Sequence, residues 1–88
     1  MSWGCDLTRD AERDLRKLPV AIQRRVARVL TQMESDPFQG DVKSLQGDDW
    51  TGMFRRRLGD YRLIFLADRK KHIVSVLRIL RRSGKTYR

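Results

Sequence analysis

The apolar residues near the start of the chain recur at the spacing of a helix. Ala11, Leu15 and Leu18 lie three or four residues apart, and the hydroxyl of Thr8 can accept a backbone N–H of the first turn. The segment WGCDL, just before Thr8, has the length of a short strand. The pattern therefore predicts a strand followed by a capped helix.

A second apolar stripe follows Pro19. It consists of Ile22, Val26, Val29, Leu30 and Met33. Proline suits the first turn of a helix and Asp36-Pro37 cannot continue one, so we expect a helix from Pro19 to Asp36 that packs against the first as a helical hairpin. Three basic residues lie off this stripe, on a face that we expect to be solvated, although so basic a helix could also contact nucleic acid: Arg24, Arg25 and Arg28.

The stretch from Asp36 to Gly52 lacks a regular pattern. It contains a proline, three of the six glycines and several aspartates. Val42, Leu45 and Trp50 are its candidate apolar anchors. We interpret the stretch as a structured connecting loop.

The next segment, MFRRRLGDYRLIF, reads as a β-hairpin. Gly59-Asp60 forms a two-residue loop of the kind that tight hairpins use, because glycine accepts a positive φ. The loop fixes the register, in which Leu58 faces Tyr61, Arg57 faces Arg62, Arg56 faces Leu63, Arg55 faces Ile64 and Phe54 faces Phe65.

Alternate pairs of this hairpin point to alternate faces. One face, expected to pack under the helices with Arg56 as its one misfit, carries Phe54, Leu58, Tyr61, Leu63 and Phe65. The opposite face carries Arg55, Arg57 and Arg62. Two facing arginines destabilise a hairpin by up to ~1 kcal/mol, whereas two guanidinium groups that share a phosphate no longer repel. The arrangement predicts an anion site.

A third long strand is expected at Ile73–Leu80, which is rich in β-branched residues and suited to a buried position. The tail RRSGKTYR follows it and has no acidic residue. Its basic residues are Arg81, Arg82, Lys85 and Arg88. Tyr87 is its only aromatic residue, and the ring could stack on a nucleic-acid base.

Charge is distributed unevenly over the 88 residues. Residues 1–52 hold eight Lys/Arg and nine Asp/Glu, whereas residues 53–88 hold twelve and two. A field of one sign on one part of a fold favours a polyanionic partner such as nucleic acid. The length and the 40% apolar content indicate a single domain over residues 1–88.

Few residues are available for metal, disulfide or membrane chemistry. Cys5 is the only cysteine and His72 is the only histidine, so we expect no zinc site, disulfide or cofactor. We interpret Cys5 as a small buried apolar residue. The chain has neither a long apolar run nor a secretory signal pattern. We expect a soluble, cytoplasmic protein.

Four segments of the sequence resemble one known family. DLTRDAERDLRKLP, DPFQGDVKSLQG, FRRRLGDYRLIF and the ending VLRILRR…TYR are together similar to the RelE/ParE superfamily of bacterial toxins from toxin–antitoxin pairs. The resemblance implies an α+β fold, with a small antiparallel sheet, the helical hairpin packed on one face and the active groove on the other. RelE-type toxins cleave mRNA in the ribosomal A site, and ParE-type toxins poison DNA gyrase.

The resemblance also assigns candidate site residues. Arg55 and Arg57 match the two basic residues that precede the RelE turn, Arg62 matches the arginine of the turn, and Tyr87 matches the terminal tyrosine. The arginine after the last strand matches Arg82 or Arg81, which remain alternatives, and the histidine common in the family is missing.

RNA cleavage by the neighbouring 2′-hydroxyl needs no metal, because the enzyme has only to position the chain and neutralise a dianionic phosphorane. Arg57, Arg62 and Arg81 or Arg82 would stabilise this transition state. Arg55 would grip a flanking phosphate and Tyr87 would stack on the attacking nucleotide, while further RNA contacts would come from Arg56, Lys85 and Arg88. The general base stays open, since arginine hardly serves as one at neutral pH.

The partners that the resemblance implies are a cognate antitoxin with an acidic or amphipathic segment, mRNA in the ribosomal A site, and rRNA. Two other functions remain open. A ParE-like gyrase inhibitor need not preserve a catalytic set, and a non-enzymatic nucleic-acid-binding module would need only the basic face.

Overall fold

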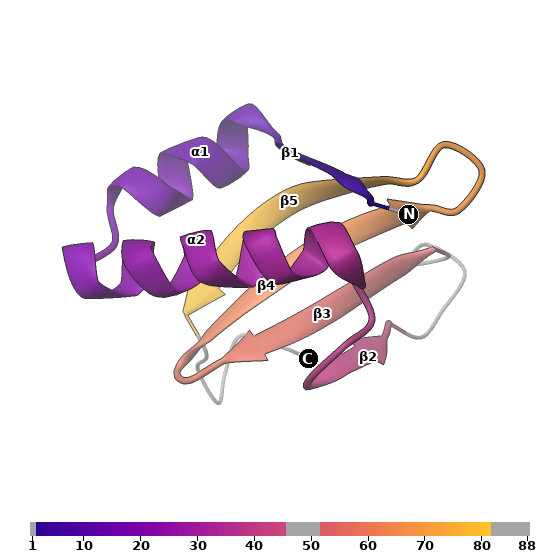
Figure 1. Ribbon diagram of the computed structural model, residues 1–88. Helices are drawn as coiled ribbons and strands as arrows, with labels where there is room; N and C mark the ends of the chain where they lie inside the picture. Colours follow the sequence, from indigo (N-terminus) through magenta and orange to yellow (C-terminus); the bar gives the residue numbers. More distant parts are fainter. Residues whose placement is uncertain (1, 46–51, 82–88) are drawn as a thin grey trace.

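The chain folds into a five-stranded sheet with two helices on one face, as seen in the computed structural model (Figure 1), which describes residues 2–45 and 52–81. In chain order the elements are β1 (Gly4–Leu7), α1 (Arg9–Arg16), α2 (Val20–Ser35), β2 (Val42–Ser44), β3 (Met53–Leu58), β4 (Tyr61–Asp68) and β5 (Ile73–Arg81). The strand order in the sheet is β1-β5-β4-β3-β2. The α+β class is confirmed.

Both helices follow their sequence signals. The hydroxyl of Thr8 accepts the N–H of Ala11 at 3.1 Å, which caps α1 as predicted. Helix α2 runs from Val20 to Ser35, one residue inside each predicted boundary, with Pro19 as its N-cap and Asp36 as its C-cap. Its basic residues off the apolar stripe are exposed, as expected: Arg24, Arg25 and Arg28. No helix in the described residues is long and apolar enough to cross a membrane.

The sheet differs from the expected antiparallel one in a single pairing. Strand β1 runs parallel to β5, with Gly4 opposite Ile73 and Leu7 opposite Val76, while the other pairings are antiparallel. A parallel pairing requires a long connection between its two strands. Here that connection consists of both helices and the three strands β2, β3 and β4, so the sheet is mixed.

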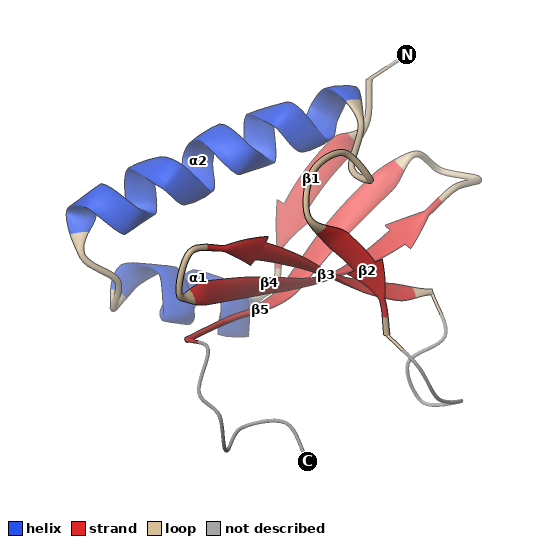
Figure 2. Ribbon diagram, turned by 90° about the horizontal axis from the view of Figure 1, so that it is seen from below, coloured by secondary structure: helices blue, strands red, loops and turns tan. Residues whose placement is uncertain are grey.

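The segment expected to be only a loop contains strand β2, which pairs with β3 at the edge of the sheet opposite to β1 (Figure 2). Val42 lies opposite Arg56, Lys43 opposite Arg55 and Ser44 opposite Phe54. The strand has three residues and is mostly exposed, so it carries no alternating pattern that a sequence could reveal.

The register of the β3–β4 hairpin is the predicted one at all five pairs. Gly59 has a φ of 60°, a value that glycine adopts without strain. Leu58, Leu63 and Phe65 are buried against the helices, which contribute Ala11, Val26, Val29 and Met33 to the same core. The predicted core face is therefore confirmed for these three hairpin residues, while Phe54 and Tyr61 are half-buried.

Beyond the end of β1, residues of the α1 segment make hydrogen bonds to the edge of β5 that β1 leaves unpaired. The hydroxyl of Thr8 donates to the carbonyl of Leu77 at 2.9 Å, and Asp14 accepts the N–H of Ile79 at 2.9 Å and the Nε–H of Arg78 at 2.8 Å. A β-bulge in β5 at this point changes its register against β4. Partial burial alone would raise the pKa of Asp14, but the hydrogen bonds and positive charge of Arg78, with the N–H of Ile79, lower it.

Cys5 is half-buried rather than buried, and its thiol donates to the carbonyl of Leu30 at 3.6 Å. Burial raises the pKa of this thiol, and the negative charges of Glu34 and Asp6 raise it further. A thiol that is harder to ionise is less reactive, so Cys5 serves as a packing residue.

Candidate phosphate-binding face

The candidate site lies on the face of the β3–β4 hairpin that the helices leave open. Arg57 and Arg62 are directly paired across the two strands, as predicted, and Arg55 lies two residues before Arg57 on the same face. The side chain of Arg55 is 13% exposed and that of Arg57 is 36% exposed. Three guanidinium groups are therefore held close together by strand geometry, at a cost in mutual repulsion.

An apolar residue lies beside these charges. Ile64 is directly opposite Arg55 and is only 7% exposed, although it belongs to the face without helices. Cross-strand neighbours on one face are close enough for an arginine stem to cover such a side chain. The low dielectric constant of an apolar surface strengthens the attraction between the guanidinium groups and an anion.

Asp41 brings a negative charge to the same place, which the sequence did not indicate. Its carboxylate lies 3.6 Å from Nη1 of Arg55 and 4.0 Å from Nε of Arg57. The N–H of Arg57 donates to the Asp41 carbonyl at 3.0 Å, which fixes the backbone of Asp41 beside β3. Both side-chain distances exceed those of charge-assisted hydrogen bonds. The carboxylate therefore forms only long ion pairs with these two arginines.

Lys43 is a second residue that the sequence interpretation missed. It pairs with Arg55 across β2 and β3 and is exposed. It extends the basic row on the open face to the edge of the sheet. Its position follows from the pairing of β2 with β3, which an isolated lysine in an irregular segment of the sequence does not predict.

Arg56 does not belong to this face. Its Nη1 donates to the carbonyl of Gln39, and its guanidinium group lies where a Cβ at Gly40 would have to be. Gly40, with a φ of 89°, therefore makes room for the one charged residue of the core face. Strand alternation turns Arg56 away from Arg55 and Arg57, and its expected RNA contact stays a prediction.

Strand register also separates Arg81 from the arginine pair. Arg81 lies opposite Tyr61, which belongs to the core-face row, whereas Arg62 lies opposite Leu80. The alternative Arg82, together with Lys85, Tyr87 and Arg88, lies outside the described residues. The roles of these five residues remain predictions.

The far end of the sheet holds aromatic rings instead of clustered arginines. Trp3 stacks on His72 at 4.6 Å and contacts Phe38 edge to face, and Phe38 meets Phe54 at 5.1 Å. Leu80, the partner of Arg62, lies eight positions after His72, or roughly 25 Å along the strand. His72 is thus too distant to take part in chemistry at Arg62.

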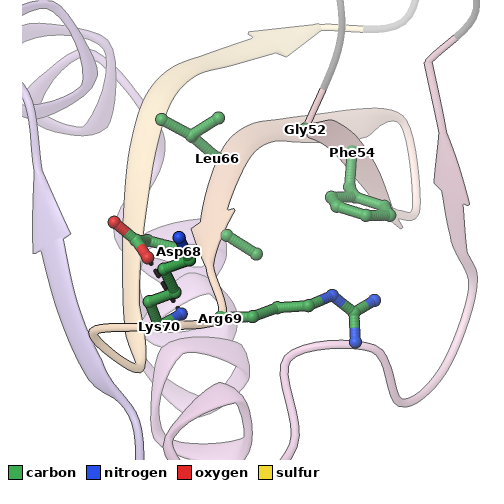
Figure 3. Close-up of a pocket in the computed structure, with 7 residues that line it drawn as sticks. Gly52, Phe54, Leu66, Asp68, Arg69 and Lys70 are labelled. Atoms are coloured by element: carbon green, nitrogen blue, oxygen red, sulfur yellow. Dashed lines mark hydrogen bonds between the residues drawn. The ribbon is translucent and has the colours of Figure 1, made fainter.

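A shallow hollow of about 430 Å³ lies at this far end as well (Figure 3). It is lined by Gly52, Phe54, Leu66, Ala67, Asp68, Arg69 and Lys70. The guanidinium group of Arg69 lies 4.5 Å from the ring centre of Phe38, and Asp68 accepts the N–H groups of Lys70 and Lys71. These polar groups already have partners inside the fold, so the hollow is a weaker candidate than the arginine face. Among residues 2–45 and 52–81, no three His, Cys, Asp or Glu side chains gather as metal ligands would.

The family model described as the ParE toxin of the type II toxin–antitoxin system parDE matches residues 6–85. The chain belongs to this toxin family. Solved structures place it within the wider RelE/ParE superfamily. It is similar to the toxin–antitoxin complex RelBE2 from Mycobacterium tuberculosis, with 30% identity and a TM-score of 0.83 over 93% of this chain and 100% of that one.

Two further structures bear on the fold of this toxin. The archaeal RelE–RelB complex from Pyrococcus horikoshii is 29% identical, with a TM-score of 0.83 over 98% of this chain and 100% of that one. The isolated RelE toxin of E. coli is 20% identical, with a TM-score of 0.79 over 97% of this chain and 89% of that one, a likeness of fold alone. No curated protein sequence matches the chain.

Proposed function

We propose that this toxin is a ribosome-dependent endoribonuclease that cuts mRNA in the ribosomal A site without a metal ion and so inhibits translation. The observation that carries the proposal is the facing pair Arg57 and Arg62, with Arg55 beside it, on the open face of the sheet. Two cationic side chains placed directly opposite each other repel, and an anion between them offsets that repulsion. A phosphate group that becomes dianionic during the reaction is an anion of this kind.

The reaction is transesterification, in which the 2′-oxygen attacks the adjacent phosphorus and the 5′-oxygen leaves. Arg57 and Arg62 stabilise the charge that develops on the phosphorane, and Arg55 holds a flanking phosphate with Lys43 beside it. Because Arg81 lies in the row of Tyr61, we favour Arg82 as the third arginine. Tyr87 stacks on the attacking nucleotide, and Lys85 and Arg88 contact the RNA backbone.

The partners of this toxin are mRNA and rRNA in the cytoplasm and a cognate antitoxin. The relatives from M. tuberculosis and P. horikoshii were solved as toxin–antitoxin complexes. A basic toxin surface favours an antitoxin segment that is acidic or amphipathic and that folds on binding, because such a segment can wrap a large surface.

A second candidate is inhibition of DNA gyrase, in the manner of the ParE branch. The family model that matches residues 6–85 carries the ParE name, which favours it. The same open face would then serve to bind a protein–DNA complex, with no requirement for a catalytic set. A non-enzymatic nucleic-acid-binding module is the remaining alternative.

Primer-extension mapping of translated mRNA, run beside a gyrase cleavage assay, separates the three. We expect new 5′ ends within codons in cells that express the wild-type toxin and none with Arg62→Ala. Accumulation of gyrase–DNA cleavage complexes without new mRNA ends would favour the gyrase inhibitor, and neither effect would favour the binding module.

A further inference from the structure

RNA cleavage by a 2′-hydroxyl requires an acceptor for the hydroxyl proton, and the arginine cluster supplies none. The pKa of an arginine side chain lies above ~12, so a guanidinium group holds its proton at neutral pH. His72 stacks on Trp3 at the far end of the sheet, and Asp68 accepts two backbone N–H groups there. The general base is therefore neither one of these arginines nor one of these two residues at the far end of the sheet.

Asp41 is a carboxylate that the fold brings to the arginines from a distant part of the sequence. It lies just before β2, and its two oxygens approach Arg55 at 3.6 Å and Arg57 at 4.0 Å. The hydrogen bond from the Arg57 N–H to the Asp41 carbonyl holds the residue in the row of Arg57. The carboxylate is therefore positioned on the candidate phosphate-binding face by the backbone, independently of its side-chain contacts.

The side chain of Asp41 keeps the freedom that a base needs. Neither ion pair is short enough for a hydrogen bond, and the side chain is 48% exposed, so its oxygens can still accept a proton from a ligand. On the arginine side, Nη1 of Arg55 and Nε of Arg57 are shielded from solvent and make no hydrogen bond within the described part of the chain. These two nitrogens therefore do not hold the carboxylate by a hydrogen bond, and the half-exposed carboxylate can turn toward the hydroxyl of a ligand whose phosphate binds the accessible atoms of Arg57.

We propose that Asp41 is the general base of the reaction, an inference that rests on the proposed endoribonuclease function. A carboxylate oxygen of Asp41 takes the proton from the 2′-hydroxyl as the 2′-oxygen bonds to phosphorus. The bond from phosphorus to the 5′-oxygen breaks, that oxygen takes a proton from water, and the protonated Asp41 gives its proton to the hydroxide that is left. The products are a 2′,3′-cyclic phosphate and a 5′-hydroxyl, with Asp41 ionised again.

The direct experiment is single-turnover cleavage of A-site mRNA on programmed ribosomes with wild type, Asp41→Asn and Asp68→Asn. Positioned general bases contribute about 10²- to 10⁴-fold, so we expect cleavage by Asp41→Asn to fall at least about 100-fold. Its affinity for ribosomes carrying mRNA with a 2′-deoxy cleavage site should stay equal or increase, because a negative charge is lost. Asp68→Asn makes the same change of charge at the far end of the sheet and should cut like wild type.

Rescue separates a base from a structural counterion. Free imidazole should raise the cleavage rate of Asp41→Ala in proportion to its concentration, since a small neutral base can replace the missing acceptor, and Asp41→Glu should keep part of the activity. Cleavage by Asp41→Asn at or above the wild-type rate would overturn the proposal and identify Asp41 as a competitor of phosphate. If Asp41→Ala bound ribosomes more weakly than wild type and imidazole did not raise its cleavage rate, the proposal would be overturned in favour of a structural role for Asp41. Absence of cleavage by the wild-type toxin would instead refute the proposed function itself.

Discussion

The two faces of the β3–β4 hairpin are built from alternate residues of the same thirteen-residue stretch, yet they obey different rules. The core face sets Leu63 and Phe65, both fully buried, against the helices. The open face sets Arg57 against Arg62 and surrounds one carboxylate, Asp41, with basic residues. One face is explained by burial of apolar area and the other is not, which is why the second indicates a ligand.

The largest difference between the faces should appear in core truncation. Phe65→Ala should lower the free energy of unfolding by about 3 to 5 kcal/mol, because it removes a fully buried ring that stacks on Phe54 at 5.6 Å. Urea denaturation followed by circular dichroism measures this. Leu66 is the next residue of the strand and is half-buried on the other face, so Leu66→Ala should lower the free energy of unfolding clearly less. Equal losses in the two variants would contradict the difference between the faces.

Asp14 tests whether stability also depends on the edge of β5. Asp14→Ala should cost about 1.5 to 3 kcal/mol, because the carboxylate, only 16% exposed, accepts hydrogen bonds from Arg78 and Ile79. Its pKa is lowered in the folded state, so its contribution is complete above the ordinary value near ~4 and is lost as pH falls through the lowered one.

Urea titrations of wild type and Asp14→Ala at several pH values should therefore converge in acid. Asp10→Asn is the matched control, since its ion pair with Arg13 is long, at 3.8 Å, and exposed. If the two curves kept a constant separation down to the lowest pH, the assigned role of Asp14 would be wrong.

A smaller effect is expected in the salt dependence of RNA binding. Each phosphate contact contributes about 0.7 to 0.9 to the slope of log K against log salt. Arg57→Gln removes one phosphate contact, so the magnitude of this slope for binding to ribosomes or RNA should fall by about 0.7 to 0.9. Arg16→Gln on α1, whose charge pairs with Glu12 at 3.9 Å, should leave it nearly unchanged. Equal slopes for both variants and wild type would mean that RNA binds another surface.

Sequence was sufficient where local chemistry decides structure. The Gly59 turn and the period-two pattern gave the register of every pair in the hairpin, and Thr8 and Asp36 marked the ends of the helices. These features depend on residues that are neighbours in the chain. The same register placed Arg57 opposite Arg62, the part of the candidate site that could be predicted.

The rest of the site depends on contacts between distant segments. Strand β2 has three residues and no apolar periodicity, so its pairing with β3, and with it the positions of Asp41 and Lys43, could not be predicted. The parallel partner of β1 and the bulge that admits Asp14 are likewise set by packing across the sheet. An isolated aspartate or lysine in an irregular stretch gives no hint of the arginine that it will meet.

The most direct test of the account combines stability and activity in Arg62→Ala. Because Arg62 lies on the open face of the sheet and not in the apolar core, its replacement should leave the protein folded, while mRNA cleavage on ribosomes and growth arrest should disappear. Arg28→Ala, an exposed arginine on α2, should retain both fold and activity. A folded Arg62→Ala that still cuts mRNA at the wild-type rate, or one that is inactive only because it is unfolded in urea titrations and circular dichroism, would contradict the claim that the open face is the functional one.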